Sequence, residues 1–235
     1  ITGGSGVDTI TTGAGNDVVY AGNGANTVTT GSGNDIVYSG VDTDTITTGV
    51  GDDVINIKGG TDTIAAGAGN DTLIADFSLA TGAVSINTLA GNATAGYAGN
   101  ISGLGIATFA GVENFEITSG GFDDVITTGD GNDVVHAGGG SDTVNLGGGN
   151  DEAIYTMAAN VGASDVYKGG DGVDTLTLEF TDDEWQSSAV KTDIANYQAH
   201  LVNHSSDPFV FASGLTVSEF ENLSVRIGDG NAEDM

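Results

Sequence analysis

A chain of 235 residues with 40 glycines, one proline and no cysteine is long enough for one or two domains, built without disulfides or thiolate metal sites. Its 33 acidic residues against four basic ones give a formal net charge of −29, which excludes nucleic acid as a partner because phosphates require a basic surface. No apolar run approaches the length of a membrane span and no signal peptide stands at the start, so we expect a chain that does not span a membrane. Its abrupt beginning and end predict a piece of a longer protein.

Nine-residue repeats fill the first part of the chain, starting with GGSGVDTIT at residues 3–11. Eight copies of the pattern G-G-x-G-x-D-x-U-x, where U is a large apolar residue, follow without a gap to residue 74. Position six is occupied by Asp8, Asp17, Asn26, Asp35, Asp44, Asp53, Asp62 and Asp71. Position eight is occupied by Ile10, Val19, Val28, Val37, Ile46, Ile55, Ile64 and Leu73. Because the glycines and the apolar residues stay in phase, the pattern argues against acidic low-complexity disorder.

Each repeat predicts a glycine-rich turn followed by a short strand with one inward apolar side chain. Two repeats then form a coil of eighteen residues, and successive coils stack their strands in parallel. The predicted fold class is therefore all-β, a parallel β-roll or β-solenoid. A core one side chain thick is too thin to offset the backbone entropy of so many glycines, so we expect bound cations to stabilise the fold.

Calcium suits the oxygens that such turns offer, because it takes roughly six to eight oxygen ligands from carboxylates and backbone carbonyls. Magnesium requires a stricter octahedron, and zinc prefers His or Cys. The coil places Asp17, Asp35, Asp53 and Asp71 in one column and Asp8, Asn26, Asp44 and Asp62 in another. We expect several Ca²⁺ ions between successive turns, held also by backbone carbonyls. Asn26 keeps an oxygen ligand but lacks the charge, Asp8 has no upstream partner, and Asp42 adds a carboxylate nearby.

The remaining chain predicts an insertion, a second repeat block and a helical segment. Residues 1–76 form the first block, and residues 77–117 form an insertion of short strands and loops that continues or caps the solenoid and ends in a connector at Glu113 and Asn114. Residues 118–180 form the second block, with an irregular coil that ends in a half-repeat at Asp165. Residues 181–235 hold the helical insertion, a strand at 209–211, a second E-N connector and a further partial repeat at 227–231. The second block adds the candidate ligands Asp124, Asp133, Asp142, Asp151 and Asp174.

The helical insertion shows a capping box, Thr181 followed by Glu184. Apolar residues then recur at helical spacing, and Trp185 is expected to pack the helix onto the second block. These apolar residues are Val190, Ile194, Tyr197 and Leu201. His200 and His204 stand four apart, as zinc ligands can, but the Glu of H-E-x-x-H is missing, which favours a pair of surface histidines.

The in-register nonapeptides resemble the RTX (repeats-in-toxin) family of calcium-binding β-rolls. This resemblance implies a secreted bacterial protein that a type I system exports unfolded and that folds on extracellular calcium. No nucleophile elbow, H-E-x-x-H or phosphate loop is present, so we predict neither an enzyme nor catalytic or cofactor-binding residues. The predicted role is structural, within a large secreted or cell-surface protein with an unidentified cell-surface or self-assembly partner.

Two alternative functions stay open at this stage. One is a segment of an adhesin or of a surface-layer lattice. The other is ice binding, because T-x-T recurs at residues 9–11, 27–29 and 45–47 on one predicted strand face, although threonine is in any case a favourable outward strand residue.

Overall fold

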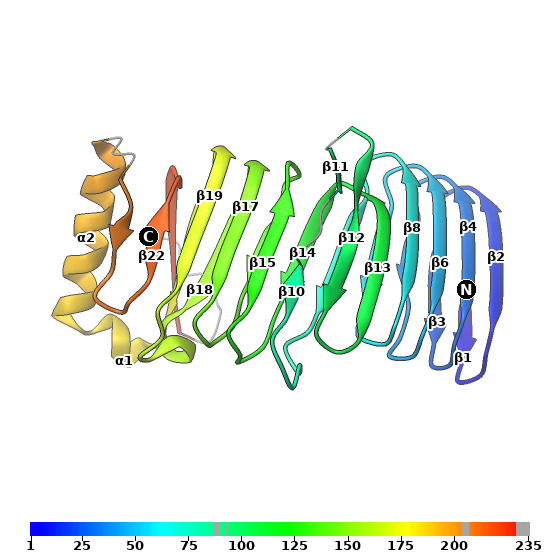
Figure 1. Ribbon diagram of the computed structural model, residues 1–235, viewed down its shortest axis with the longest axis horizontal. Coiled ribbons are helices and arrows are strands. Elements are labelled where there is room, and N and C mark those ends of the chain that lie inside the picture. Colours follow the sequence, from blue (N-terminus) through cyan, green and yellow to red (C-terminus); the bar gives the residue numbers. More distant parts are fainter. Residues whose placement is uncertain (87–89, 93, 204–206, 229–235) are drawn as a thin grey trace.

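The computed structural model of the chain describes residues 1–86, 90–92, 94–203 and 207–228. These residues form one elongated solenoid, with the first coil at one end and the helical segment at the other (Figure 1). Most strands pair in parallel, so the predicted all-β parallel β-roll is confirmed. None of the helices in the described part is long and apolar enough to cross a membrane.

One sheet runs along the whole solenoid with ten parallel strands in the described part of the chain. We call it sheet A, and its strands are, in spatial order, β1 (Thr2–Gly4), β3 (Val18–Gly22), β5 (Ile36–Tyr38), β7 (Val54–Ile57), β9 (Thr72–Asp76), β14 (Asn114–Thr118), β16 (Val134–His136), β18 (Glu152–Thr156), β20 (Thr175–Phe180) and β23 (Asn222–Ile227). The sheet passes directly from β9 to β14, so the insertion between them does not interrupt it.

The opposite sheet, sheet B, contains the insertion within its strand order. Its strands are β2 (Thr9–Ala14), β4 (Thr27–Ser32), β6 (Thr45–Val50), β8 (Thr63–Ala68), β13 (Ile106–Val112), β12 (Gly96–Ser102), β10 (Ser85–Ile86), β15 (Val125–Gly129), β17 (Thr143–Gly149), β19 (Val166–Gly172), β22 (Thr216–Ser218) and β21 (Phe209–Val210), with β11 (Ala90–Asn92) beside β12. Strand β13 pairs in parallel with β8, and β10 pairs in parallel with β15. Strand β12 lies antiparallel between them. The insertion therefore continues the solenoid (Figure 1). The predicted division of the chain into segments that end at residues 76, 117 and 180 stays a proposal.

The strand register repeats every coil, so that Thr9, Thr27 and Thr45 lie side by side. The position-eight residues point inward as predicted. The strands of sheet B run further than predicted, however, and bring a second side chain per repeat into the interior. Thr30 and Thr48 are fully buried, and the Thr30 hydroxyl donates to the Thr48 carbonyl at 3.1 Å. The expectation of a core one side chain thick is therefore wrong, and the buried hydroxyls are satisfied by the next coil.

Glycine at the turns permits the close stacking of coils. Gly31 has a φ of 118°, a conformation that L side chains rarely adopt. A side chain at Gly31 would also overlap the carbonyl oxygen of Gly13 in the preceding coil. Backbone therefore lies on backbone at the turns, which brings the acidic residues of neighbouring repeats together.

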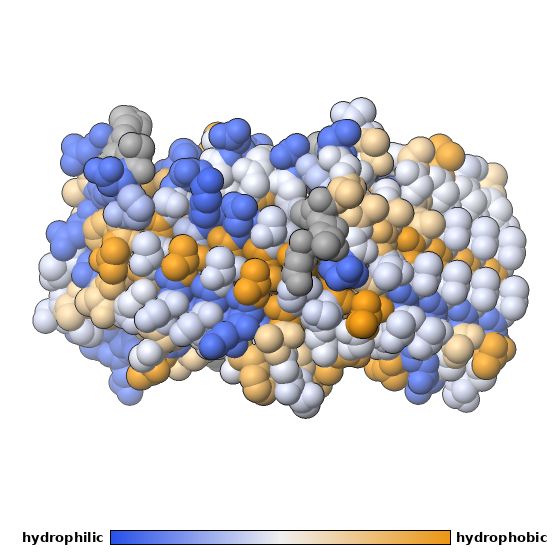
Figure 2. All heavy atoms as spheres, in the orientation of Figure 1, coloured by the Kyte–Doolittle hydropathy of each residue, from blue (hydrophilic) through white to orange (hydrophobic). Residues whose placement is uncertain are grey.

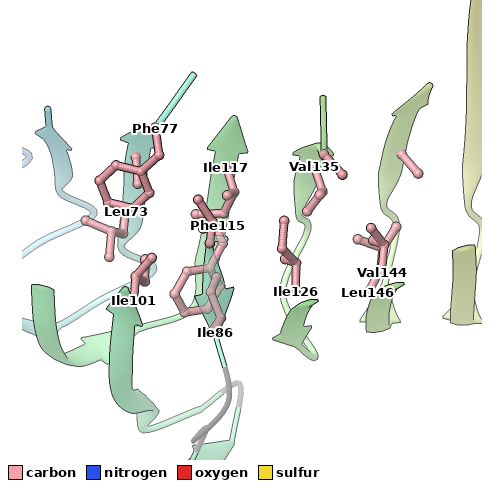
Figure 3. Packing of buried hydrophobic residues seen from close by; sticks show 14 of the residues in the cluster. Leu73, Phe77, Ile86, Ile101, Phe115, Ile117, Ile126, Val135, Val144 and Leu146 are labelled. Atoms are coloured by element: carbon pink, nitrogen blue, oxygen red, sulfur yellow. The ribbon is translucent and has the colours of Figure 1, made fainter. Parts of the chain in front are cut away.

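Larger side chains fill the middle of the solenoid, where the insertion meets the two blocks (Figure 3). Leu73, Phe77, Ile86, Ile101 and Phe115 gather there from strands of both sheets and from the start of the insertion. The Phe115 ring also packs edge-on against that of Phe109, with the ring centroids 5.2 Å apart. This packing joins the insertion to the rows of smaller apolar side chains inside the two repeat blocks.

The helical segment covers the far end of the roll. The capping box of Thr181 and Glu184 is confirmed, and it opens α1 (Asp182–Trp185). A break at residues 186–187 separates α1 from α2 (Ser188–Val202), in which Ile194 and Tyr197 are buried. Trp185 packs against Phe180 of β20, with the ring centroids 5.7 Å apart, as predicted.

The histidine pair of the helical segment is only partly described. His200 lies against Tyr197, with ring centroids 6.0 Å apart. His204 lies outside the described residues, so the predicted surface pair stays a prediction.

Candidate calcium-binding columns

The acidic residue at position six immediately precedes a strand in each repeat, and stacking arranges these residues in two columns. We call column A the set before the strands of sheet A and column B the set before those of sheet B. Column A contains Asp17, Asp35, Asp53, Asp71, Asp133, Asp151 and Asp174. Column B contains Asp8, Asn26, Asp44, Asp62, Asp124, Asp142 and, in addition, Asp165. Every predicted ligand thus falls in a column.

After the first aspartate of each column, one carboxylate oxygen of each aspartate rung, that is, of each position-six residue in the stack, accepts a hydrogen bond within the protein. The backbone N–H of Asp17 donates to Oδ1 of Asp35 at 2.8 Å, and that of Asp35 donates to Oδ1 of Asp53 at 2.8 Å. The carbonyl of Asp17 accepts from the N–H of Ile36 at 2.8 Å. The spacing of these pairs is 18 residues, so each coil hydrogen-bonds to the next through its acidic residue.

The second carboxylate oxygen, Oδ2, is buried and has no hydrogen-bond partner in most rungs. The rungs concerned are Asp8, Asp35, Asp44, Asp53, Asp62, Asp71, Asp124, Asp133, Asp142, Asp151, Asp165 and Asp174. A buried carboxylate oxygen without a donor carries a large desolvation cost, which a bound cation removes. The residues present therefore fit a series of cation sites.

The donor set suits calcium. Within the described ranges, no three His, Cys, Asp or Glu side chains gather as a metal site. We expect a cation in the columns to be held by carboxylate oxygens together with backbone carbonyls of the turns. Calcium accepts this mixture in a flexible geometry, whereas zinc prefers nitrogen or sulfur. When bound, calcium would supply the positive charge that the columns lack.

Without a bound cation, burial raises the pKa of several aspartates in the columns. Burial, together with neighbouring carboxylates such as Asp53, raises the pKa of Asp71 from its ordinary 3.8 to about 7. Burial likewise raises the pKa of Asp142 and Asp151 to about 7 and that of Asp62 and Asp133 to about 6. Asp71, Asp142 and Asp151 are therefore expected to bind protons near neutral pH unless a cation replaces them.

These shifts predict an unusual pH dependence of the metal-free chain. A carboxyl with a raised pKa binds its proton more tightly in the folded state, so it stabilises the fold at acidic pH and loses that effect as the pH rises from about 4 through the folded values near 6 and 7. In excess chelator, we expect circular dichroism to show more strand structure at about pH 5 than at about pH 8. With calcium present the trend should reverse, because protons compete with the ion. A metal-free strand signal that falls on acidification would contradict this explanation.

Asn26 differs from the other rungs. Its Oδ1 accepts from the N–H of Asp8 at 2.9 Å, and its Nδ2 donates to the carbonyl of Gly22 at 3.4 Å. Asn26 therefore offers one side-chain oxygen, already bonded to the N–H of Asp8, where an aspartate offers two. Its place among the calcium ligands stays a prediction.

The two E-N connectors are rungs of column A, which the sequence did not indicate. Glu113 Oε2 accepts from the N–H of Asp71 at 2.8 Å, and Glu221 Oε2 accepts from the N–H of Asp174 at 2.8 Å. In both places a glutamate stands where a repeat would have its aspartate. The only available signal was that both E-N pairs come directly before or at the start of an apolar strand segment, as the repeat aspartates do.

Residues at position five form a second ladder on the outside of the turns. The N–H of Asp52 donates to Oδ1 of Asn34 at 3.1 Å, and the N–H of Asn70 donates to Oδ1 of Asp52 at 2.9 Å. This outer ladder runs in the opposite direction to the columns, since each side chain accepts from the following coil. Its members are exposed, so we assign the cation sites to the buried residues at position six.

A parallel β-roll whose stacked glycine-rich turns hold two columns of buried, unpaired carboxylate oxygens defines a cation-binding repeat protein. The RTX calcium-binding nonapeptide repeat matches the chain in four copies, over residues 2–37, 20–55, 58–77 and 118–153, so the chain carries repeats of this family. The repeats of this family bind calcium, in agreement with the predicted cofactor. No curated protein matches the chain. Asp165 and Asp174 lie beyond the matched residues but within the same two columns.

Proposed function

We propose that this chain is a calcium-dependent structural region of a large bacterial protein that is secreted or displayed at the cell surface. After export through a type I system, calcium outside the cell would enter the two columns and fold the β-roll. The observation that carries the proposal is the repeated buried Oδ2 without a hydrogen-bond partner. The ligands are the acidic rungs of both columns together with carbonyls of the glycine-rich turns. A calcium titration of the metal-free chain, followed by circular dichroism, tests the proposal.

The proposed role is mechanical and not catalytic. Both sheets run through the insertion, so the described part forms a continuous rod (Figure 1). A rod of this kind suits the stalk of an adhesin or a subunit of a surface-layer lattice, and this assignment is the finer form of the proposal. Sedimentation of the calcium-loaded chain over a range of protein concentrations tests for self-assembly.

The register of the threonines favours ice binding as a second candidate function. Thr9, Thr27, Thr45 and Thr63 form one exposed row, and Thr11, Thr29 and Thr47 form the next. Figure 2 shows mainly pale rows over β2, β4 and β6, with a band of hydrophilic residues beside them. If it orders water, the calcium-loaded chain should show thermal hysteresis, and Thr29→Tyr, which breaks the flat row, should abolish it. An absence of hysteresis at saturating calcium would rule this candidate out.

A further inference from the structure

Glu152 differs from the residues that stand at the same repeat position in sheet A. It is the first residue of β18, directly after Asp151, where the other repeats of this sheet have Val, Ile or Thr. It lies between Val134 of β16 and Thr175 of β20, with a half-buried side chain on the outer face of the sheet. Its carboxylate adds a charge to a chain that already carries −29, and it belongs to neither column.

The only arginine of the chain holds this carboxylate. Arg226 of β23 donates from Nη2 to Oε1 of Glu152 at 2.8 Å and from Nη1 to Oε1 of Glu179 at 3.3 Å. The hydroxyl of Thr177 donates to the same Oε1 of Glu152 at 2.6 Å. Within the described part of the chain, no hydrogen bond reaches Oε2 of Glu152. The side chain is therefore held in place by one oxygen while the other remains available.

Glu152 borders a depression of about 360 Å³ on the outside of sheet A. This volume lies within the range of roughly 300–1,000 Å³ that is typical of small-molecule sites. Polar and apolar side chains from neighbouring coils line it with Glu152, among them Asn132, Val134, Asn150, Val173, Thr175 and Ser224. The column rungs Asp133 and Asp151 also border it, but they are only 1% and 3% exposed, so a ligand would meet the other side chains first.

The polar side chains of the depression have unused hydrogen-bonding groups. Asn150 accepts from the N–H of Val173 through Oδ1 at 3.1 Å, and Asn132 accepts from the N–H of Asn150 in the same way at 2.9 Å. Among the described residues, neither amide nitrogen has a protein partner, and neither do the hydroxyls of Thr175 and Ser224. Donors and the free carboxylate oxygen thus line one space beside two valines.

We propose that this depression binds a neutral saccharide unit, with Glu152 and Asn150 holding hydroxyls of the sugar and the valines contacting its C–H face. A sugar ring carries hydroxyls that both donate and accept, together with apolar C–H groups, so it matches a mixed lining. An acidic sugar would be repelled, because the columns are negative and Arg226 is already paired with two glutamates. This binding activity goes beyond the structural role proposed above and requires only the folded roll.

Saturation-transfer difference NMR on the calcium-loaded chain tests the proposal with the methyl glycosides of glucose, mannose and galactose. These neutral hexosides differ in the orientation of single hydroxyls, and glucuronic acid is the charged comparison. Titration of the signal gives the affinity, and circular dichroism verifies the fold of each variant.

Thr175→Val and Glu152→Gln are the test variants, and Thr72→Val is the matched control. Both threonines occupy position seven of a repeat, begin a strand of sheet A and make no side-chain hydrogen bond among the described residues. Thr72 lies on β9, outside the depression. The loss of the Thr175 hydroxyl should therefore leave the fold intact, so this variant keeps the test valid even if Glu152→Gln disturbs the contact with Arg226.

We expect at least one neutral hexoside to receive saturation from the wild-type chain and glucuronic acid to receive much less. Glu152→Gln should weaken binding roughly tenfold, because a charged acceptor is lost, and Thr175→Val roughly threefold, whereas Thr72→Val should leave it unchanged.

A folded chain that transfers saturation to none of the three hexosides would overturn the site. Binding that both test variants leave unchanged, or that Thr72→Val weakens as much as Thr175→Val does, would overturn it too. Equal transfer to glucuronic acid would contradict the assigned preference for a neutral ligand. A chain that stays unfolded at saturating calcium would refute the proposed function as well as the site, since the depression exists only in the folded roll.

Discussion

Removal of calcium is expected to abolish most of the strand structure of this chain, and restoring calcium should rebuild it. The metal-free roll would have to bury a series of unpaired carboxylate oxygens in a chain of net charge −29. Each buried, uncompensated charge costs several kcal/mol, and a native domain is stable by only about 5–15 kcal/mol in total. A few empty rungs therefore suffice to unfold the roll.

The same reasoning sets the strength of the calcium effect. At a free calcium concentration of 100 times the dissociation constant, one site contributes about 2.7 kcal/mol to folding. Several sites together exceed the stability of an ordinary domain, so the calcium dependence should be steep. The midpoint should fall near 10⁻⁴ to 10⁻³ M, roughly the range of extracellular calcium modules.

Far-ultraviolet circular dichroism in excess chelator, followed by titration with calcium, measures this transition. Magnesium at matched concentration and ionic strength is the control, because it dehydrates reluctantly and demands an octahedral site. Magnesium should leave the chain largely unfolded, which separates ion coordination from general screening of charge. A strand signal that persists in excess chelator would show that the core alone holds the roll.

The repeat region could be predicted from the sequence because two signals recur in the same phase. Glycine marks the turns, and position eight marks the inward face, so the coil, the parallel pairing and the two columns follow directly. Val28 and Ile46, for example, are fully buried side by side, as the nine-residue spacing requires.

The insertion could not be predicted in the same way. Strands β10, β12 and β13 have no repeated spacing, and their order in sheet B depends on contacts with β8 and β15, which belong to different blocks. Only the assembled structure shows that β13, β12 and β10 together take the place of a single strand of sheet B. The inward positions of Thr30 and Thr48 were missed because a lone threonine in a turn reads as polar and exposed.

The different roles of the two oxygens of each carboxylate could not be predicted from the sequence either. Spacing places Asp35 above Asp17, but it does not say that Oδ1 binds a backbone N–H and that Oδ2 remains unpaired. Glu113 was read as a connector for the same reason. Its role as a rung depends on the pairing of β14 with β9, across a separation of 42 residues from Asp71.

Asp53→Asn should weaken calcium-induced folding strongly, while the neighbouring Asp52→Asn should leave it almost unchanged. Asp53 is 1% exposed in the middle of the first block, with Oδ1 bonded to the N–H of Asp35 and Oδ2 unpaired. An asparagine can keep the first contact but would present an amide nitrogen in place of Oδ2. We expect the calcium midpoint to rise roughly tenfold, the change that follows from the loss of one ligand charge.

Asp52→Asn is a matched control because it removes the same charge one residue away. Asp52 is exposed, and its side chain accepts from the N–H of Asn70 through Oδ1, which an asparagine can also do. If both variants shift the midpoint equally, net charge and not coordination governs folding, and the columns lose their assigned role.

The reverse substitution, Asn26→Asp, strengthens the comparison. It converts the one amide rung of the first block into a carboxylate, replacing the Nδ2 that binds the Gly22 carbonyl by an oxygen. Coordination predicts that this variant folds at a lower calcium concentration and binds an additional ion, even though its net charge is more negative. General charge repulsion predicts the opposite sign. Calcium titrations of Asp53→Asn, Asp52→Asn and Asn26→Asp, read by circular dichroism and calorimetry, therefore distinguish the two explanations by direction as well as by size.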